Sequence, residues 1–143
     1  MKRVVPWLAL LLVSCANPKY APSDSAETGD QGSGLGCQAR FQGGQCVSIS
    51  WEKKPTDEEF GSFLFKVFRQ GATPILEDPP NVSVILWMPG MGHGSSPVTV
   101  ARLDVGTYRA SEVFFTMGGD WEIRFHVKEG QNVQDQASVP FRF

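Results

Sequence analysis

Soft metal-ligand side chains gather at two places in this 143-residue sequence. Apart from Met1, the methionines are Met88 and Met91, in the segment WMPGMGHG, and Met117, in the segment FFTMGGDW. His93, one of only two histidines, follows Met91 by two residues, so both side chains of an extended segment would point to the same side. Thioether sulfur and imidazole nitrogen are suitable ligands for Cu(I) outside the cytoplasm. The pattern therefore predicts a Cu(I) site, with no built-in negative charge, formed by these three methionines and His93.

A second interpretation of the same residues needs no metal. A methionine at a strand end often fills a gap in the core, and the glycines of segment 90–94 allow a tight connection whatever the side chains do. The other histidine, His126, alternates with the charged residues at 122, 124 and 128, which predicts a surface position. We find no combination of residues suited to hydrolysis or group transfer, and we expect that the protein is not an enzyme.

The N-terminus predicts export and a lipid anchor. Lys2 and Arg3 precede an apolar run at 4–13 that is shorter than the roughly 20 residues of a membrane-spanning helix. The end of this run, Leu-Val-Ser-Cys at 12–15, resembles the bacterial lipobox. We expect a signal peptide at 1–14 and a lipidated Cys15; ordinary cleavage nearby is the alternative. Ala16 follows the cysteine in place of Asp, which by resemblance to sorted lipoproteins favours the outer membrane, facing the periplasm.

A linker and a short disulfide loop are expected next. Residues 15–36 are rich in Pro, Ser, Gly and Asp and have little to bury, so they predict a flexible tether. Cys37 and Cys46 flank a segment containing Gly-Gly, and in an oxidising compartment they predict a disulfide that stabilises by about 2–3 kcal/mol. A two-thiolate metal site is the alternative for these cysteines.

The charge balance limits the partners. The chain has 15 acidic and 13 basic residues, and removal of the signal peptide takes away two of the basic ones. This acidic balance does not predict binding to nucleic acid or to an anionic membrane surface, so membrane attachment must come from the N-terminal lipid.

From residue 37 onward the hydrophobic pattern is that of short strands. Apolar and polar residues alternate, turn residues recur every 8–12 positions, and no long helical period is present. Seven strands are expected, at 46–51, 63–68, 82–88, 98–103, 107–115, 121–127 and 137–143. The sequence predicts an all-β domain at 37–143 with an immunoglobulin-like antiparallel sandwich of about seven strands.

Three motifs in this domain resemble a known family. Met-Pro-Gly-Met-Gly-His at 88–93, Gly-Thr-Tyr at 106–108 and Met-Gly-Gly-Asp-Trp at 117–121 are similar to segments of the YtkA-like and FixH-like families of exported β-sandwich domains. The FixH-like branch is associated with copper supply to cytochrome oxidase. The resemblance implies that Met88, Met91, His93 and Met117 lie at the metal-binding end of the sandwich.

We therefore expect a lipid-anchored periplasmic Cu(I) carrier or sensor, whose partners are the membrane and a copper-donating or copper-accepting envelope protein. The alternative is a metal-free interaction module of the cell envelope. The two hypotheses differ in whether the loop at 88–93 responds to Cu(I).

Overall fold

The structure is a computed structural model, and it describes residues 35–143. The expected signal peptide at 1–14, the expected lipid-bearing Cys15 and most of the expected linker at 15–36 lie outside the described residues. None of the residues from 35 onward belongs to a helix long and apolar enough to cross a bilayer.

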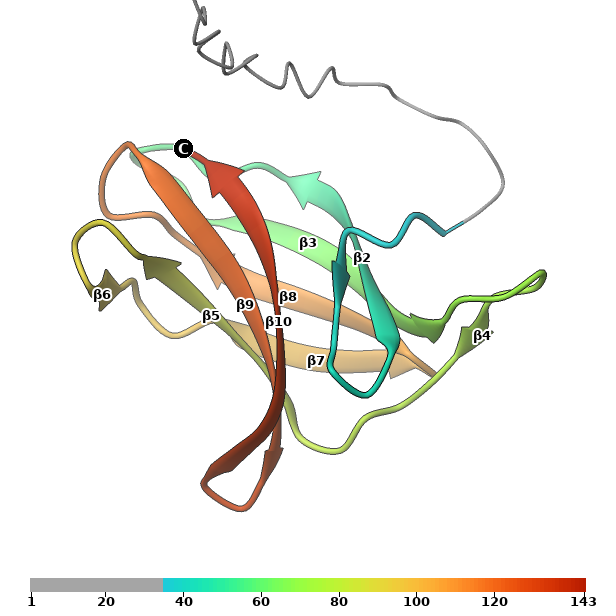
Figure 1. The fold of residues 1–143 in the computed structure, drawn as a ribbon. Coiled ribbons are helices and arrows are strands. Elements are labelled where there is room, and N and C mark those ends of the chain that lie inside the picture. Colours follow the sequence, from blue (N-terminus) through green and yellow to red (C-terminus); the bar gives the residue numbers. More distant parts are fainter. Residues whose placement is uncertain (1–34) are drawn as a thin grey trace, which may run out of the picture. The chain divides into compact units, whose positions relative to one another are not determined.

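The described part of the chain is an antiparallel β-sandwich (Figure 1). Its ten strands are β1 (Ala39–Arg40), β2 (Gln45–Lys53), β3 (Gly61–Arg69), β4 (Ile75–Leu76), β5 (Val82–Met88), β6 (His93–Gly94), β7 (Thr99–Asp104), β8 (Thr107–Val113), β9 (Asp120–Glu129) and β10 (Asn132–Arg142). The first sheet has the order β1-β2-β3-β8-β7, with β4 added beside β3, and the second has the order β10-β9-β5-β6.

The all-β class is confirmed, and each of the seven expected strands corresponds to an observed one. The three additional strands, β1, β4 and β6, have two residues each, too few to show an alternating pattern. β10 begins at Asn132, five residues before the expected start, because the polar stretch NVQDQ pairs with β9 and projects as the end of a hairpin (Figure 1). Hydrogen-bonded pairing needs no apolar residue when both faces of a strand are in solvent.

The core lies between the two sheets and is mainly aromatic. In β9, Trp121, Ile123 and Phe125 point inward and are at most 1% exposed. Phe125 packs against Phe63 and Phe65 of β3, and the rings of Phe65 and Phe125 are 5.0 Å apart between centroids. Burying such side chains stabilises by about 1.5–3 kcal/mol each, which explains why the alternating pattern sets the register of these strands.

The predicted disulfide between Cys37 and Cys46 is present, with an S–S distance of 2.09 Å, so the alternative of a two-thiolate metal site is wrong. The loop that it closes is also held from the other sheet. The carboxylate of Asp135 in β10 accepts hydrogen bonds from the backbone N–H groups of Gln42 and Gly43, at 2.9 and 2.8 Å. The bridge therefore closes one end of the sandwich, where β2 begins and β3 ends.

Candidate functional site

Met91 and His93 come from the hairpin that joins β5 to β6. The backbone N–H groups of Met91 and Gly92 both donate to the carbonyl oxygen of Met88, at 3.2 and 2.9 Å, and the positive φ of Gly92 (68°) completes the reversal. The segment is therefore a tight turn and not an extended strand. The premise of an extended segment, from which Met91 and His93 were expected to point to the same side, is therefore wrong, because Met91 lies in the turn and His93 begins β6.

Met117 comes from the loop 114–119, which crosses from β8 to β9 and so from one sheet to the other. Trp121 holds this loop, because its indole N–H donates to the carbonyl oxygen of Met117 at 3.0 Å. Gly119 exchanges two backbone hydrogen bonds with Phe143, at 2.9 and 3.0 Å, which fixes the other side of the loop. Met117 is thus presented by a loop with three ordered backbone contacts.

The three methionines line one hollow of about 540 Å³ at this end of the sandwich. Met88 is buried, with 5% of its surface exposed, whereas Met91 and Met117 are 62% and 43% exposed. Trp121 also lines the hollow. Residues 88 and 117 are far apart in the sequence, so the fold brings together every thioether of the described chain.

Gly119 leaves the space that Met88 occupies. A Cβ atom placed on Gly119 would lie 2.9 Å from Met88 Cε, closer than real Cβ contacts allow. The φ of Gly119 (145°) also belongs to a backbone conformation that favours glycine. The buried thioether is therefore held between the core and this glycine.

His93 lies next to the hollow without lining it. It is the cross-strand partner of Met88, and its ring contacts Trp121 edge-on at 6.1 Å between centroids. Its Nδ1 is 3.1 Å from the carbonyl oxygen of Gly94. If Nδ1 carries the proton and donates it to that oxygen, Nε2 keeps its lone pair. Of the four predicted ligands, the structure brings three to the hollow and leaves His93 as a neighbour of Met88.

Two carboxylates that sequence reasoning did not include line the same hollow. Asp120 pairs with Arg142 at 2.5 Å and Glu122 pairs with Arg124 at 2.7 Å. The hollow therefore has two acidic groups in addition to the neutral ligands predicted from the sequence, and each negative charge has its own arginine. Asp120 is the first and Glu122 the third residue of β9, which follows the loop that carries Met117.

The donor set discriminates between classes of metal. Within residues 35–143, no group of three or more His, Cys, Asp or Glu side chains is arranged to hold a metal ion. Zinc and the hard divalent cations depend on those donors. Three neutral thioethers in one hollow fit a soft monovalent ion such as Cu(I).

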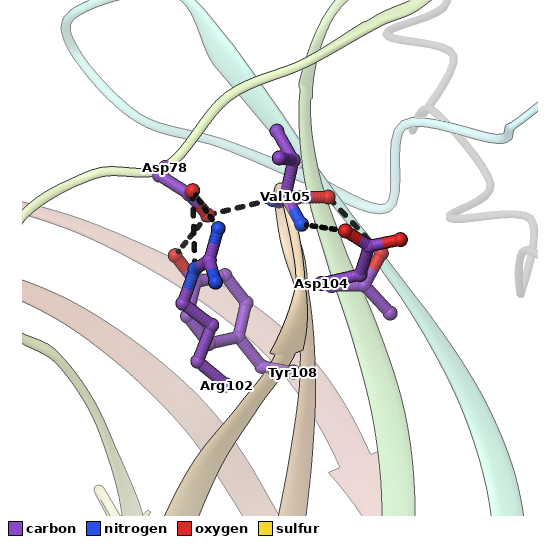
Figure 2. Close-up of polar contacts among 7 residues, drawn as sticks. Asp78, Arg102, Asp104, Val105 and Tyr108 are labelled. Atoms are coloured by element: carbon purple, nitrogen blue, oxygen red, sulfur yellow. Dashed lines mark hydrogen bonds and ion pairs between the residues drawn. The ribbon is translucent and has the colours of Figure 1, made fainter.

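A second polar cluster, centred on Asp78, fixes the hairpin between β7 and β8 (Figure 2). Its carboxylate accepts hydrogen bonds from the Arg102 guanidinium (2.6 and 3.1 Å), the Gly106 backbone N–H (2.7 Å) and the Tyr108 hydroxyl (3.0 Å). These donors, Arg102 first, lower the pKa of Asp78 to about 2. Burial and then Asp78 raise the pKa of Tyr108 to about 12. The Gly-Thr-Tyr motif therefore has a structural role.

His126 differs from its prediction. It lies on the outer face of the second sheet, opposite Ser83 of β5 and Gln136 of β10, but both ring nitrogens are buried. Within the described residues, neither nitrogen has a hydrogen-bond partner. The buried hydroxyl of Ser83 also has none. Burial, followed by the charges of Lys128 and Arg124, lowers the pKa of His126. Alternation alone predicts an exposed ring, whereas both of its nitrogens are buried.

Comparison with known proteins gives one family. A family model described as YtkA-like matches residues 47–126, which is more than half of the chain and includes all three methionines of the hollow. No curated protein and no solved structure matches the chain.

Proposed function

The chain belongs to the YtkA-like family, and from this premise we propose that its hollow binds Cu(I) as cargo, so that the protein is a copper carrier or sensor. The observation that supports this proposal is the convergence of Met88, Met91 and Met117 on one hollow. These are all the methionines of the sequence other than Met1.

The chemistry of the donors supports a monovalent soft ion. A thioether is neutral and polarisable, so three of them stabilise Cu(I) without the negative charge that would attract Mg²⁺ or Ca²⁺. The two carboxylates at the hollow are each paired with an arginine, so they add little net negative potential inside the hollow. His93, as the cross-strand neighbour of Met88, is available as a fourth ligand if its ring turns toward the hollow.

A Cu(I) titration tests the proposal. The full chain, solubilised in detergent, is titrated with Cu(I) in competition with bicinchoninate under anaerobic conditions. We expect one ion per chain. Replacement of Met91 or Met117 by Leu keeps volume and apolarity and removes only the sulfur, so each variant should bind more weakly.

His126→Ala is the control for the titration. The ring of His126 does not line the hollow, so the variant should bind Cu(I) with the same affinity as the wild type. Wild-type protein that takes up no Cu(I) would overturn the proposal. The metal-free alternative, in which the hollow receives an apolar side chain of an envelope partner, would then hold, and the Met→Leu variants would keep that function.

We also propose that the protein is anchored by a lipid on Cys15 and acts in the periplasm, without catalysis, together with a copper-donating or copper-accepting envelope protein. The support is the lipobox-like sequence at 12–15 and the charged start of the chain. Wild-type protein should be labelled by fatty acid and should partition into detergent, and Cys15→Ser should lose both properties. Unlabelled wild-type protein in the periplasmic fraction would contradict the anchor.

A further inference from the structure

The three thioethers of the hollow differ strongly in how they are held. Met88 is 5% exposed, ends β5 and has its terminal methyl against Gly119. Met91 is 62% exposed at a hairpin turn, and Met117 is 43% exposed in the loop before β9. A ligand set of this kind has one fixed member inside the domain and two members at its surface.

This difference has an energetic consequence for any ion in the hollow. Met88 is already confined to the space beside Gly119, so coordination costs it little rotamer freedom. Met91 and Met117 must be immobilised, and ordering a flexible side chain lowers the affinity by about fivefold. The sulfur of Met88 therefore contributes more net affinity than either of the other two.

The difference also determines which bonds an acceptor can reach. A donor atom arriving from solvent meets the exposed side chains of Met91 and Met117 first, whereas Met88 is covered by the core. Thioethers are neutral, so each exchange breaks one Cu–S bond and forms one bond to the acceptor. The departing thioether takes up no proton, any proton released comes from a thiol of the acceptor, and copper stays in the same oxidation state.

We propose, on the basis of the Cu(I) site described above, that Met88 is the holding ligand and that Met91 and Met117 are the exchange ligands. Copper passes to an acceptor with soft sulfur or nitrogen donors through a shared intermediate, in which the acceptor has replaced the two exposed methionines and Met88 is the last protein ligand. Transfer by this route needs no opening of the sandwich.

Transfer kinetics of the wild type test the proposal. The full chain, loaded with Cu(I), is mixed rapidly with increasing concentrations of bathocuproine disulfonate, and formation of the coloured complex is followed. Attack on the bound ion predicts a rate constant that rises linearly with chelator concentration. A rate constant that does not depend on chelator concentration would mean that the ion leaves before the acceptor arrives, and it would overturn the proposal.

Matched variants test the roles of the individual residues. Met88→Leu should lose about fivefold more Cu(I) affinity than Met91→Leu or Met117→Leu, each measured against bicinchoninate. Equal losses, or a larger loss for Met91→Leu, would contradict the holding role of Met88. Urea midpoints identify any variant with a disturbed core. If Met88→Leu is such a variant, its affinity is left out of the comparison and the wild-type transfer kinetics decide whether the proposal holds. Absence of Cu(I) binding by the wild type overturns the proposed function itself, an outcome distinct from binding with concentration-independent transfer.

Discussion

Replacement of Gly106 by Ala is expected to destabilise the domain by about 3–5 kcal/mol. Gly106 lies between β7 and β8 with a φ of 56°, a conformation that costs an alanine about 1 kcal/mol. Its Cβ would lie 2.6 Å from the carbonyl oxygen of Val67 and 2.9 Å from the backbone nitrogen of Glu77. Backbone must therefore move, at about 1–3 kcal/mol for overpacking.

The same displacement weakens two hydrogen bonds. Val67 N–H donates to the carbonyl oxygen of Gly106 at 2.8 Å, and Gly106 N–H donates to Asp78 at 2.7 Å. Each is worth about 1 kcal/mol, and part of this energy is lost when the turn shifts. For a domain of this size the total corresponds to a fall in Tm of about 12–20 °C. Urea unfolding, followed by circular dichroism and tryptophan fluorescence, measures the loss directly.

Two further glycines separate the contributions. Gly130 has nearly the same φ (59°), but no atom lies within 4 Å of the point that a Cβ would occupy, so Gly130→Ala should cost only the conformational part, about 1 kcal/mol. Gly90 has neither a positive φ nor a neighbour there, so Gly90→Ala should remain within about 0.5 kcal/mol of the wild type. If Gly106→Ala proves no more harmful than Gly130→Ala, the steric reasoning is refuted.

Three more outcomes are expected. Replacing both Cys37 and Cys46 by Ala should lower the free energy of unfolding in urea by about 2–3 kcal/mol, because the bridged residues are nine apart. The same variant should keep its Cu(I) affinity. Loss of Cu(I) binding in a folded variant would contradict the independence of the bridge and the hollow. The lowered pKa of His126 means that, as pH falls, the imidazole is protonated in the unfolded chain before it is protonated in the folded one. The free energy of unfolding therefore reaches its full value above about pH 6.5. Below that pH it decreases by at most about 1.4 kcal/mol per pH unit. His126→Gln should flatten this acid-side decline in urea midpoints, and an unchanged slope would refute the assignment. The lowered pKa of Asp78 means that the stabilisation by its carboxylate is complete above about pH 4 and is lost as pH falls toward 2. The difference in Tm between wild type and Asp78→Asn should therefore narrow over that range. A constant difference would exclude the charge of Asp78 as the cause of the stabilisation.

The strands and the methionines could be predicted because both are local features of the sequence. Trp121, Ile123 and Phe125 alternate with polar residues, and an alternating stretch has only one way to bury its apolar face. The grouping of Met88 and Met91 with Met117 came from the confinement of these methionines to two segments and from the family resemblance, and the structure places all three at one hollow.

Other parts of the site depended on geometry that residue spacing does not contain. His93 was assigned to the hollow by assuming an extended segment, whereas the turn closed by Gly92 directs it toward Trp121. Asp78 and Tyr108 are 30 residues apart, and nothing near either one predicts their hydrogen bond. For His126, alternation indicated the correct face of the sheet, but the burial of its ring nitrogens depends on the packing of that face, which alternation does not contain.

The two ends of the sandwich are not equivalent attachment points for a fused or immobilised partner. The described chain enters through the disulfide loop at Cys37, beside the start of β2, whereas the hollow lies at the other end, where β5 finishes and β9 starts. Phe143 pairs with Gly119 in the wall of that hollow, and Figure 1 shows the C-terminus at the end where β9 starts. A reporter or surface linker joined ahead of Cys37 therefore leaves the methionines accessible, whereas the same group joined after Phe143 begins beside Met117 and obstructs the entrance.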